Sequence, residues 1–195
     1  MSTLKTDKLV ALGGMGGSIQ ITPDSALSGA DAGSIRAPGS IIQTVLIKSH
    51  NRTTYSAPYT GNGTTITDLN LTITPKSTSS LIMIEYSIFC EVTYNTVWLM
   101  HRGGSLIGYN TDAGNNYWSG LSANLYDGDD STTPWNCHLM YFDRPGTTSA
   151  VTYAPAFRPS NGSTFTLALN RALSSVGTSG QENGVSIGVA MEIAQ

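Results

Sequence analysis

The residues that could carry catalysis are few, and their spacing does not suit it. Cys137 and His138 are neighbours in a segment that alternates like a β-strand, so their side chains point to opposite faces and cannot form a nucleophile–base pair. Glu85 and Glu91 share one face of another such segment, but at ~3.3 Å per residue they lie roughly 20 Å apart, too far for paired-carboxylate hydrolysis. No G-x-S-x-G, H-E-x-x-H or P-loop pattern occurs. We therefore expect no enzymatic activity and no cofactor.

Metal-ligating residues are equally sparse. The chain has three histidines, His50, His101 and His138. No H-x-H or C-x-x-C pattern links them, so we interpret them as ordinary sheet or loop residues; the alternative is one histidine per subunit meeting at a trimer axis. An acidic cluster, Asp127 to Asp130, has carboxylates at a spacing that can chelate Ca²⁺, but the EF-hand pattern is not met. We interpret it as a solvated loop and predict no metal site.

Two turn-rich segments, 110–118 and 127–135, combine aromatic rings with amide and carboxylate groups. Sugar-binding and protein-binding surfaces use this combination. The alternative is that the rings close the ends of a β-sandwich. The residues proposed for surface binding are Tyr109, Asn110, Asp112, Tyr117, Trp118, Asp127 and Trp135, with Tyr126 between the two segments.

The segment Leu81 to Tyr94, LIMIEYSIFCEVTY, organises the rest of the chain. Its even positions, from Ile82 to Tyr94, are apolar or aromatic, and its odd positions are mixed. A period of two with β-branched residues predicts a long strand with one apolar face. We expect it in the middle of a sheet, with a second apolar layer over its even face.

Further strands are predicted at 41–49, 69–74, 97–102, 105–109, 137–143, 151–157, 164–170 and 185–193, with 51–65 as a loop. Gly103-Gly104 predicts a hairpin turn. Pro155 and Pro159 predict that 151–157 is an edge strand. In the last strand, the odd-numbered side chains from Val185 to Ile193 form an apolar face. The side chains on the opposite face are small and would let another sheet or subunit approach closely. Eight or nine short strands and no amphipathic helix predict an all-β fold, a jelly-roll-like β-sandwich.

Composition narrows the classes of partner. Charged residues are only 12%, about half the usual ~25%, so either hydroxyls and amides cover the surface or much of it meets other subunits. The net charge is −3 and no basic run occurs, which argues against nucleic acid. No apolar run approaches ~18 residues, and the N-terminus has no signal-peptide h-region, so we expect no membrane insertion.

Cys90 and Cys137 could form one disulfide, but two buried free thiols suit a cytoplasmic origin better.

Residues 1–40 differ from residues 41–195, which we predict to be a β-sandwich knob domain. Within residues 1–40, glycines at seven positions separate short apolar pieces, and such a segment cannot bury a core of its own. We expect an extended Gly-rich arm that docks on neighbouring subunits; the alternative is an arm that folds back on its own domain.

Four pieces of the sequence, in this order, resemble a recurrent pattern: MSTLKTDKL, GSIIQTV, LNLTITPKSTSSLIMIEY and VSIGVAMEI. The pattern is similar to that of tail-fibre and related virion proteins of tailed phages, common in marine and cyanobacterial phages. The similarity covers 2–12, 39–49, 69–92 and 185–193 and leaves the stretch between Tyr94 and Asn183 unmatched. It implies a trimeric β-sandwich knob whose N-terminal arm anchors it to the virion, through residues that include Leu4, Lys5, Lys8, Leu9 and Leu12.

Three functions are compatible with these observations. The first is a short homotrimeric fibre or adhesin, made in the host cytoplasm and built into the virion, which binds other virion proteins through its arm and a host surface glycan or protein through its loops. The second is a head-decoration or cement protein, since the chain has no shaft, collagen-like repeat or heptad run. The third is a free lectin-like carbohydrate-binding module. A dimer formed through the 151–157 edge is the alternative to the trimer.

Overall fold

The computed structural model describes residues 37–112, 119–124, 126, 128, 133–160, 162–174 and 182–195. Nearly all regular structure in this part is β-strand. The elements in chain order are β1 (Ile41–Ser49), β2 (Thr54–Ala57), β3 (Thr64–Thr65), the 3-10 helix η1 (Thr67–Leu69), β4 (Leu71–Ile73), β5 (Leu81–Val92), β6 (Thr96–Arg102), β7 (Ser105–Gly108), β8 (Ser122–Ala123), β9 (Trp135–Asp143), β10 (Val151–Pro159), β11 (Phe165–Leu169) and β12 (Ser186–Ile193). No helix in the described part of the chain is long and apolar enough to cross a membrane.

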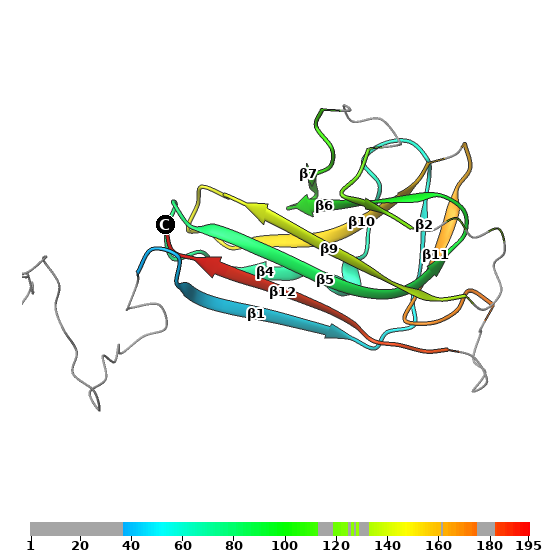
Figure 1. The fold of residues 1–195 in the computed structure, drawn as a ribbon, viewed down its shortest axis with the longest axis horizontal. Helices are drawn as coiled ribbons and strands as arrows, with labels where there is room; N and C mark the ends of the chain where they lie inside the picture. Colours follow the sequence, from blue (N-terminus) through cyan, green and yellow to red (C-terminus); the bar gives the residue numbers. More distant parts are fainter. Residues whose placement is uncertain are drawn as a thin grey trace, which may run out of the picture.

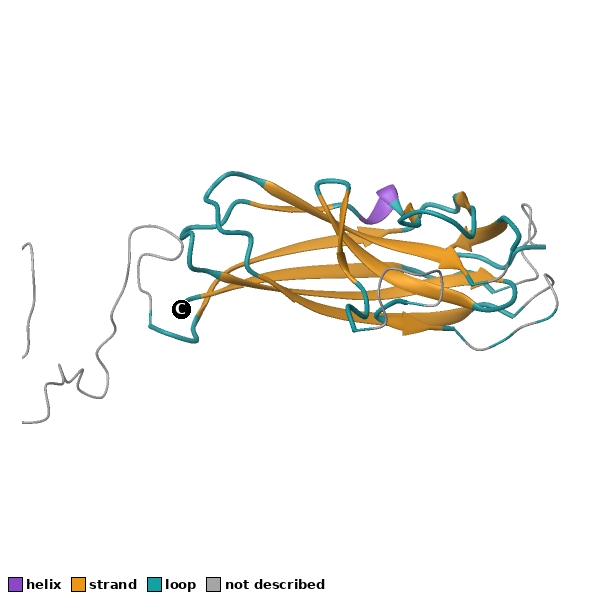
Figure 2. Ribbon diagram, turned by 90° about the horizontal axis from the view of Figure 1, so that it is seen from above, coloured by secondary structure: helices purple, strands orange, loops and turns teal. Residues whose placement is uncertain are grey.

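The strands form two antiparallel sheets, so the predicted all-β fold is confirmed as a β-sandwich. Sheet A has the order β1-β12-β5-β11-β2, and β9 pairs with the other side of β5. Sheet B has the order β3-β10-β6-β7, with β4 also pairing with β10 and β8 with β6. Figure 1 looks onto sheet A with the strands of sheet B behind it, and Figure 2 shows the strands running along the long axis of the molecule.

The long strand β5 lies at the centre of sheet A, as predicted. It pairs with β12 over residues 81–87, with β11 over 90–92, and with β9 along its other side. Its even-numbered side chains from Ile82 to Val92 are buried and face the second sheet. There they pack with Trp98, Met100, Tyr153 and Phe157 of sheet B in one hydrophobic core. The alternation of apolar side chains along β5 therefore decides which face of sheet A packs against sheet B.

The hairpin predicted at Gly103-Gly104 is confirmed. β6 pairs with β7 across these glycines, whose φ angles of 56° and 81° lie in the left-handed region that glycine tolerates. The loop predicted at 51–65 is partly wrong, because it contains β2 and β3. β2 adds to the edge of β11, and β3 pairs with β10.

The prediction that 151–157 is an edge strand is wrong. β10 lies inside sheet B, between β6 on one side and β3 and β4 on the other. The carbonyl of Pro155 accepts a hydrogen bond from the Ile66 amide at 2.9 Å. The N–H and C=O of a residue in an antiparallel strand point to the same side, so the N–H that proline lacks would point at the interruption between β3 and β4. The neighbouring strand is broken where the proline cannot donate, and the 151–157 edge required for the alternative dimer does not exist.

The last strand presents its small residues to the interior. Ser186, Gly188, Ala190 and Glu192 are buried, and the apolar side chains between them point away from the core. A Cβ at Gly188 would lie 2.4 Å from a ring atom of Tyr86. The Tyr86 ring fills the space over this glycine, and its hydroxyl donates to the carbonyl groups of Leu69 and Tyr153. The close approach expected at this face occurs within the sandwich.

Both cysteines are free and buried. Cys90 pairs with Trp135 and Cys137 with Ile88, so the two cysteines are diagonal neighbours on β5 and β9. Diagonal neighbours lie about 7–8 Å apart, beyond the usual span of a disulfide. Burial also raises the pKa of both thiols, which keeps them protonated and unreactive.

Candidate functional site

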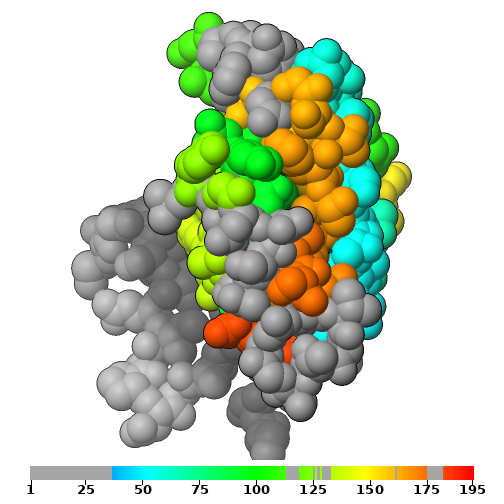
Figure 3. Space-filling model, turned by 90° about the vertical axis from the view of Figure 1, so that its right-hand side faces the viewer, coloured from blue at the N-terminus to red at the C-terminus, as the bar shows by residue number. Residues whose placement is uncertain are grey.

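One end of the sandwich carries an aromatic cluster. β5 ends at Val92, and Tyr94 follows with a φ of 57°, which turns the chain back into β6. The Tyr94 ring stacks on Phe165 at a centroid distance of 5.0 Å and meets the edge of Tyr126 at 5.8 Å. Tyr126 is 67% exposed, so its ring is open to solvent while its neighbours support it. Figure 3 looks onto this end of the molecule.

A shallow groove of about 180 Å³ lies at the same end of β6. It is lined by Asn95, Thr96, Val97, Ala123, Asn124 and Ser160. The side chain of Asn124 makes two hydrogen bonds. Its Nδ2 donates to the Tyr94 carbonyl at 2.8 Å, and its Oδ1 accepts from the Thr96 backbone amide at 2.7 Å. Ser160 donates to the Asn95 carbonyl through its backbone amide at 3.0 Å and its hydroxyl at 3.1 Å. These bonds fix the walls of the groove and leave the exposed Asn95 side chain at its rim.

The predicted binding residues that the structure describes fall into two groups. Asn110 Oδ1 accepts a hydrogen bond from the Asp112 amide at 3.1 Å, and the Asn110 carbonyl accepts from Ser119 Oγ at 2.7 Å, so both atoms shape the turn after β7 that begins at Tyr109. Trp135 begins β9, and its ring meets the buried Trp98 ring edge-on at 5.9 Å. Trp135 thus closes the core at this end.

The other predicted residues lie outside the described residues. They are Leu4, Lys5, Lys8, Leu9 and Leu12 of the arm, Tyr117 and Trp118 of the first loop, and Asp127 of the acidic cluster. Within the described part, sequence reasoning missed Tyr94, Phe165 and Asn124 as members of one surface. Tyr94 was visible as the aromatic end of the long strand, but only the fold brings it beside Phe165.

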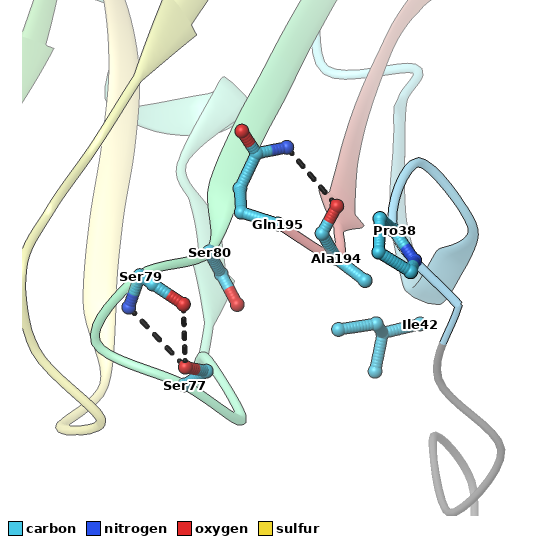
Figure 4. Close-up of a pocket in the computed structure, with 7 residues that line it drawn as sticks. All are labelled: Pro38, Ile42, Ser77, Ser79, Ser80, Ala194 and Gln195. Atoms are coloured by element: carbon cyan, nitrogen blue, oxygen red, sulfur yellow. Dashed lines mark hydrogen bonds between the residues drawn. The ribbon is translucent and has the colours of Figure 1, made fainter.

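The opposite end of the sandwich holds a second hollow, of about 260 Å³ (Figure 4). Pro38, Ile42 and Ala194 form its apolar side, and serines and the terminal glutamine form its polar side. Here the Gly39 amide donates to the Ala194 carbonyl at 2.8 Å, and the Ala194 amide donates to the Ser40 carbonyl at 2.9 Å. The chain therefore enters the sandwich beside its own C-terminus.

A buried carboxylate holds the loop beside this hollow. Glu192 is fully buried and accepts hydrogen bonds from Gln43 Nε2 (2.5 Å), the Lys76 amide (2.6 Å) and Ser80 Oγ (2.5 Å). Burial raises the pKa of Glu192, but these hydrogen bonds outweigh it and the net pKa lies below the ordinary value. The charged form is therefore the one that orders the loop from Thr74 to Ser80.

The histidines do not converge. His101 is buried and its Nε2 lies 2.8 Å from the Asn62 carbonyl, whereas His138 pairs with Glu85 at 2.8 Å on the outer face of sheet A. Among the described residues, no three histidine, cysteine, aspartate or glutamate side chains lie close enough together to share a metal ion.

Comparison with known proteins identifies no family for this chain. The chain matches no family model and no curated protein sequence. Among solved structures it is similar to infectious bursal disease virus Gx strain (13% identity, TM-score 0.33) and to the VP2 subviral particle of infectious bursal disease virus (12% identity, TM-score 0.33). Each match covers 91% of this chain and 42% of the other, so this chain spans less than half of theirs. A TM-score of 0.33 carries no argument about fold or function.

Proposed function

We propose that this protein is a non-enzymatic structural component of a tailed-phage virion, a short homotrimeric fibre or adhesin. Its N-terminal arm, residues 1–40, attaches to other virion proteins, and its far end meets the host surface. One observation carries the proposal: the two ends of the sandwich expose different chemical groups. The chain enters at Ala37 beside its own C-terminus, and the exposed aromatic and amide groups lie at the other end of β5.

The strand order supports a jelly roll. Sheet A contains the order β1-β12-β5-β9 and sheet B the order β4-β10-β6-β7. A chain that alternates between two sheets in this way forms interlocked Greek keys, the arrangement of jelly rolls, which are common in viral capsid and lectin domains. Fold alone does not give function, so the proposal also rests on the resemblance of the sequence pieces to phage virion proteins.

Two other functions keep specific support. The sequence contains no heptad or collagen-like repeat, which suits a head-decoration protein that holds to capsid subunits through its arm. The exposed ring of Tyr126 beside an amide-lined groove suits a lectin-like module. In both cases the loop end would be the outward-facing surface.

The test is removal of residues 1–36 from the gene in the phage that encodes it. We expect particles that lack this protein, while the purified 37–195 chain keeps its β-sheet circular dichroism and cooperative unfolding. Particles that still contain the shortened protein would overturn the anchoring role. Absence of the full-length protein from particles would overturn both virion roles and leave the lectin-like module.

A further inference from the structure

The outer face of sheet A is apolar and open. Of the described residues, seven large apolar side chains are more than a third exposed, and five of them lie on this face: Ile41, Leu46, Met140, Phe142 and Ile187. They come from β1, β12 and β9, which flank β5 side by side in Figure 1. Single exposed apolar residues are ordinary, but a contiguous group marks an interaction surface.

The strand register joins these side chains into continuous rows. Leu46, Val189, Glu85 and Met140 are direct partners across the four strands. Thr44, Met191, Met83 and Phe142 form the next row. Direct partners in an antiparallel sheet lie on the same face about 5 Å apart. The apolar side chains therefore form one surface across β1, β12, β5 and β9, with Glu85 within it.

Sheet B is treated differently by the same chain. Its outward side chains Leu99 and His101 on β6 and Arg158 on β10 are 0%, 4% and 2% exposed. Loops cover them: His101 contacts the Asn62 carbonyl, and Arg158 donates to the carbonyl groups of Gly61 and Ser119. The described chain thus supplies its own cover for these residues of sheet B. On sheet A its loops cover only the far end of the outer face, at Glu91, and leave the part beside residues 81–87 of β5 open.

The size of the open face suits a second folded surface. Four strands spaced ~4.8 Å apart, with four rows of side chains spaced ~6.7 Å apart at residues 81, 83, 85 and 87 of β5, give about 500 Å². Three such faces around one axis bury up to about 1,500 Å² in all, more than the ~800 Å² below which most crystal-packing contacts fall. A single extended segment, such as the arm, would cover a stripe one strand wide, about a quarter of the face.

The charge pattern favours a copy of the same surface. Glu85 and His138 lie near the middle of the face and pair with each other at 2.8 Å, and Lys48 lies on the outer strand β1. The face therefore offers little net charge to attract an acidic or basic partner, and two copies bring no large like-charged groups together. Charge-poor, Met-containing and aromatic surfaces are typical of interface cores.

We propose that copies of this chain associate through the outer face of sheet A, with Leu46, Val189, Met140 and Phe142 at the contact. In the homotrimer three such faces turn towards the common axis, and each packs partly on the other two. This inference deepens the proposed function, because it names the surface by which the homotrimer forms; its test uses purified protein and does not depend on the phage particle.

The experiment is light scattering after size exclusion on the full-length chain and three variants. Leu46→Glu and Met140→Glu place a carboxylate on the face, at side chains that are 69% and 49% exposed and so tolerate the change in the monomer. Tyr126→Glu is the matched control, since this side chain is 67% exposed but lies at the loop end. We expect an oligomer for the wild type and Tyr126→Glu, and the 20.6 kDa monomer for both face variants, with unchanged circular dichroism.

Three outcomes would overturn the proposal. The first is a wild-type monomer at every concentration up to about 100 µM; if deletion of residues 1–36 then increased the binding of a hydrophobic dye, the arm would be the occupant. The second is an oligomer that survives both face substitutions. The third is dissociation by Tyr126→Glu as well, which would show that the loss is not specific to this face. None of these outcomes bears on incorporation into particles, so the proposed virion role would be judged separately.

Discussion

Single buried polar residues tie the loops of this protein to sheet A. Glu192 binds the loop from Thr74 to Ser80. Glu91 accepts hydrogen bonds from the backbone amides of Thr133 (3.2 Å) and Leu173 (2.5 Å) and so binds two loops at the other end. Both side chains are almost fully buried, and the hydrogen bonds named here are all donated to their carboxyl oxygens. These bonds are therefore part of the loop geometry.

We predict that Glu192→Gln lowers the free energy of unfolding by about 2 kcal/mol at pH 7, because the new amide group faces donors and leaves one of them unpaired. The measurement is urea unfolding followed by circular dichroism. The matched control is Glu182→Gln, since Glu182 is exposed. A loss as large in the control would show that the effect is not due to the buried hydrogen bonds.

The same carboxylate predicts a pH dependence. The pKa of Glu192 is lower in the folded protein than in the unfolded chain, where it is about 4.3. Its contribution is fully present above that value and is lost as the pH falls through the folded pKa. We expect wild type to lose more stability than Glu192→Gln between pH 5 and pH 3. Parallel pH profiles for the two proteins would contradict the assignment.

At the scale of elements, sequence patterns predicted strands better than their orientation. The alternation of β5 gave both its central place and its buried face, and Gly103-Gly104 gave the hairpin. Alternation in β12 defined two faces but not which one is internal, because neither face is strongly charged. The answer lies in Tyr86, about a hundred residues earlier, whose ring needs the space over Gly188. For β10, the prolines are tolerated because its neighbour is interrupted, which no local pattern reveals.

We predict that Gly188→Ala destabilises the sandwich by about 1–3 kcal/mol, because the added methyl group would lie 2.4 Å from the Tyr86 ring and force it to move. Gly162→Ala is the matched control, as its Cβ would meet nothing within 4 Å. Urea unfolding midpoints of the two variants measure the difference. Equal midpoints would contradict the packing of Tyr86 on β12.

At the scale of the whole molecule, the sequence predicted some members of the loop-end surface but not its assembly. Tyr126 and Trp135 stand out as aromatic residues in polar loops, yet they differ in role: Tyr126 is exposed, and Trp135 packs on Trp98. Tyr94 and Phe165 join this end only because β11 begins where the antiparallel β5 ends. The open face of sheet A was also invisible in the sequence, since it depends on the orientation of β12.

These features give the molecule three distinct surfaces. At one end residues 39 and 40 lie beside the C-terminus, the other end presents aromatic and amide groups, and sheet A has an open apolar outer face, the surface proposed above for association. A fibre or adhesin needs each of these: an attachment, a contact with the host and a means of assembly. A decoration protein needs the first and a capsid-facing contact, and a free lectin needs only the second.

The most direct test of the central claim is to label purified phage particles with an antibody raised against residues 41–195 and to view them by electron microscopy. If the protein is a fibre or adhesin, labels will lie at the tail, at the sites where fibres attach. Labels spread over the head would contradict the fibre assignment and support the decoration protein. Unlabelled particles, from a lysate in which the antibody detects the soluble protein, would contradict a virion role altogether.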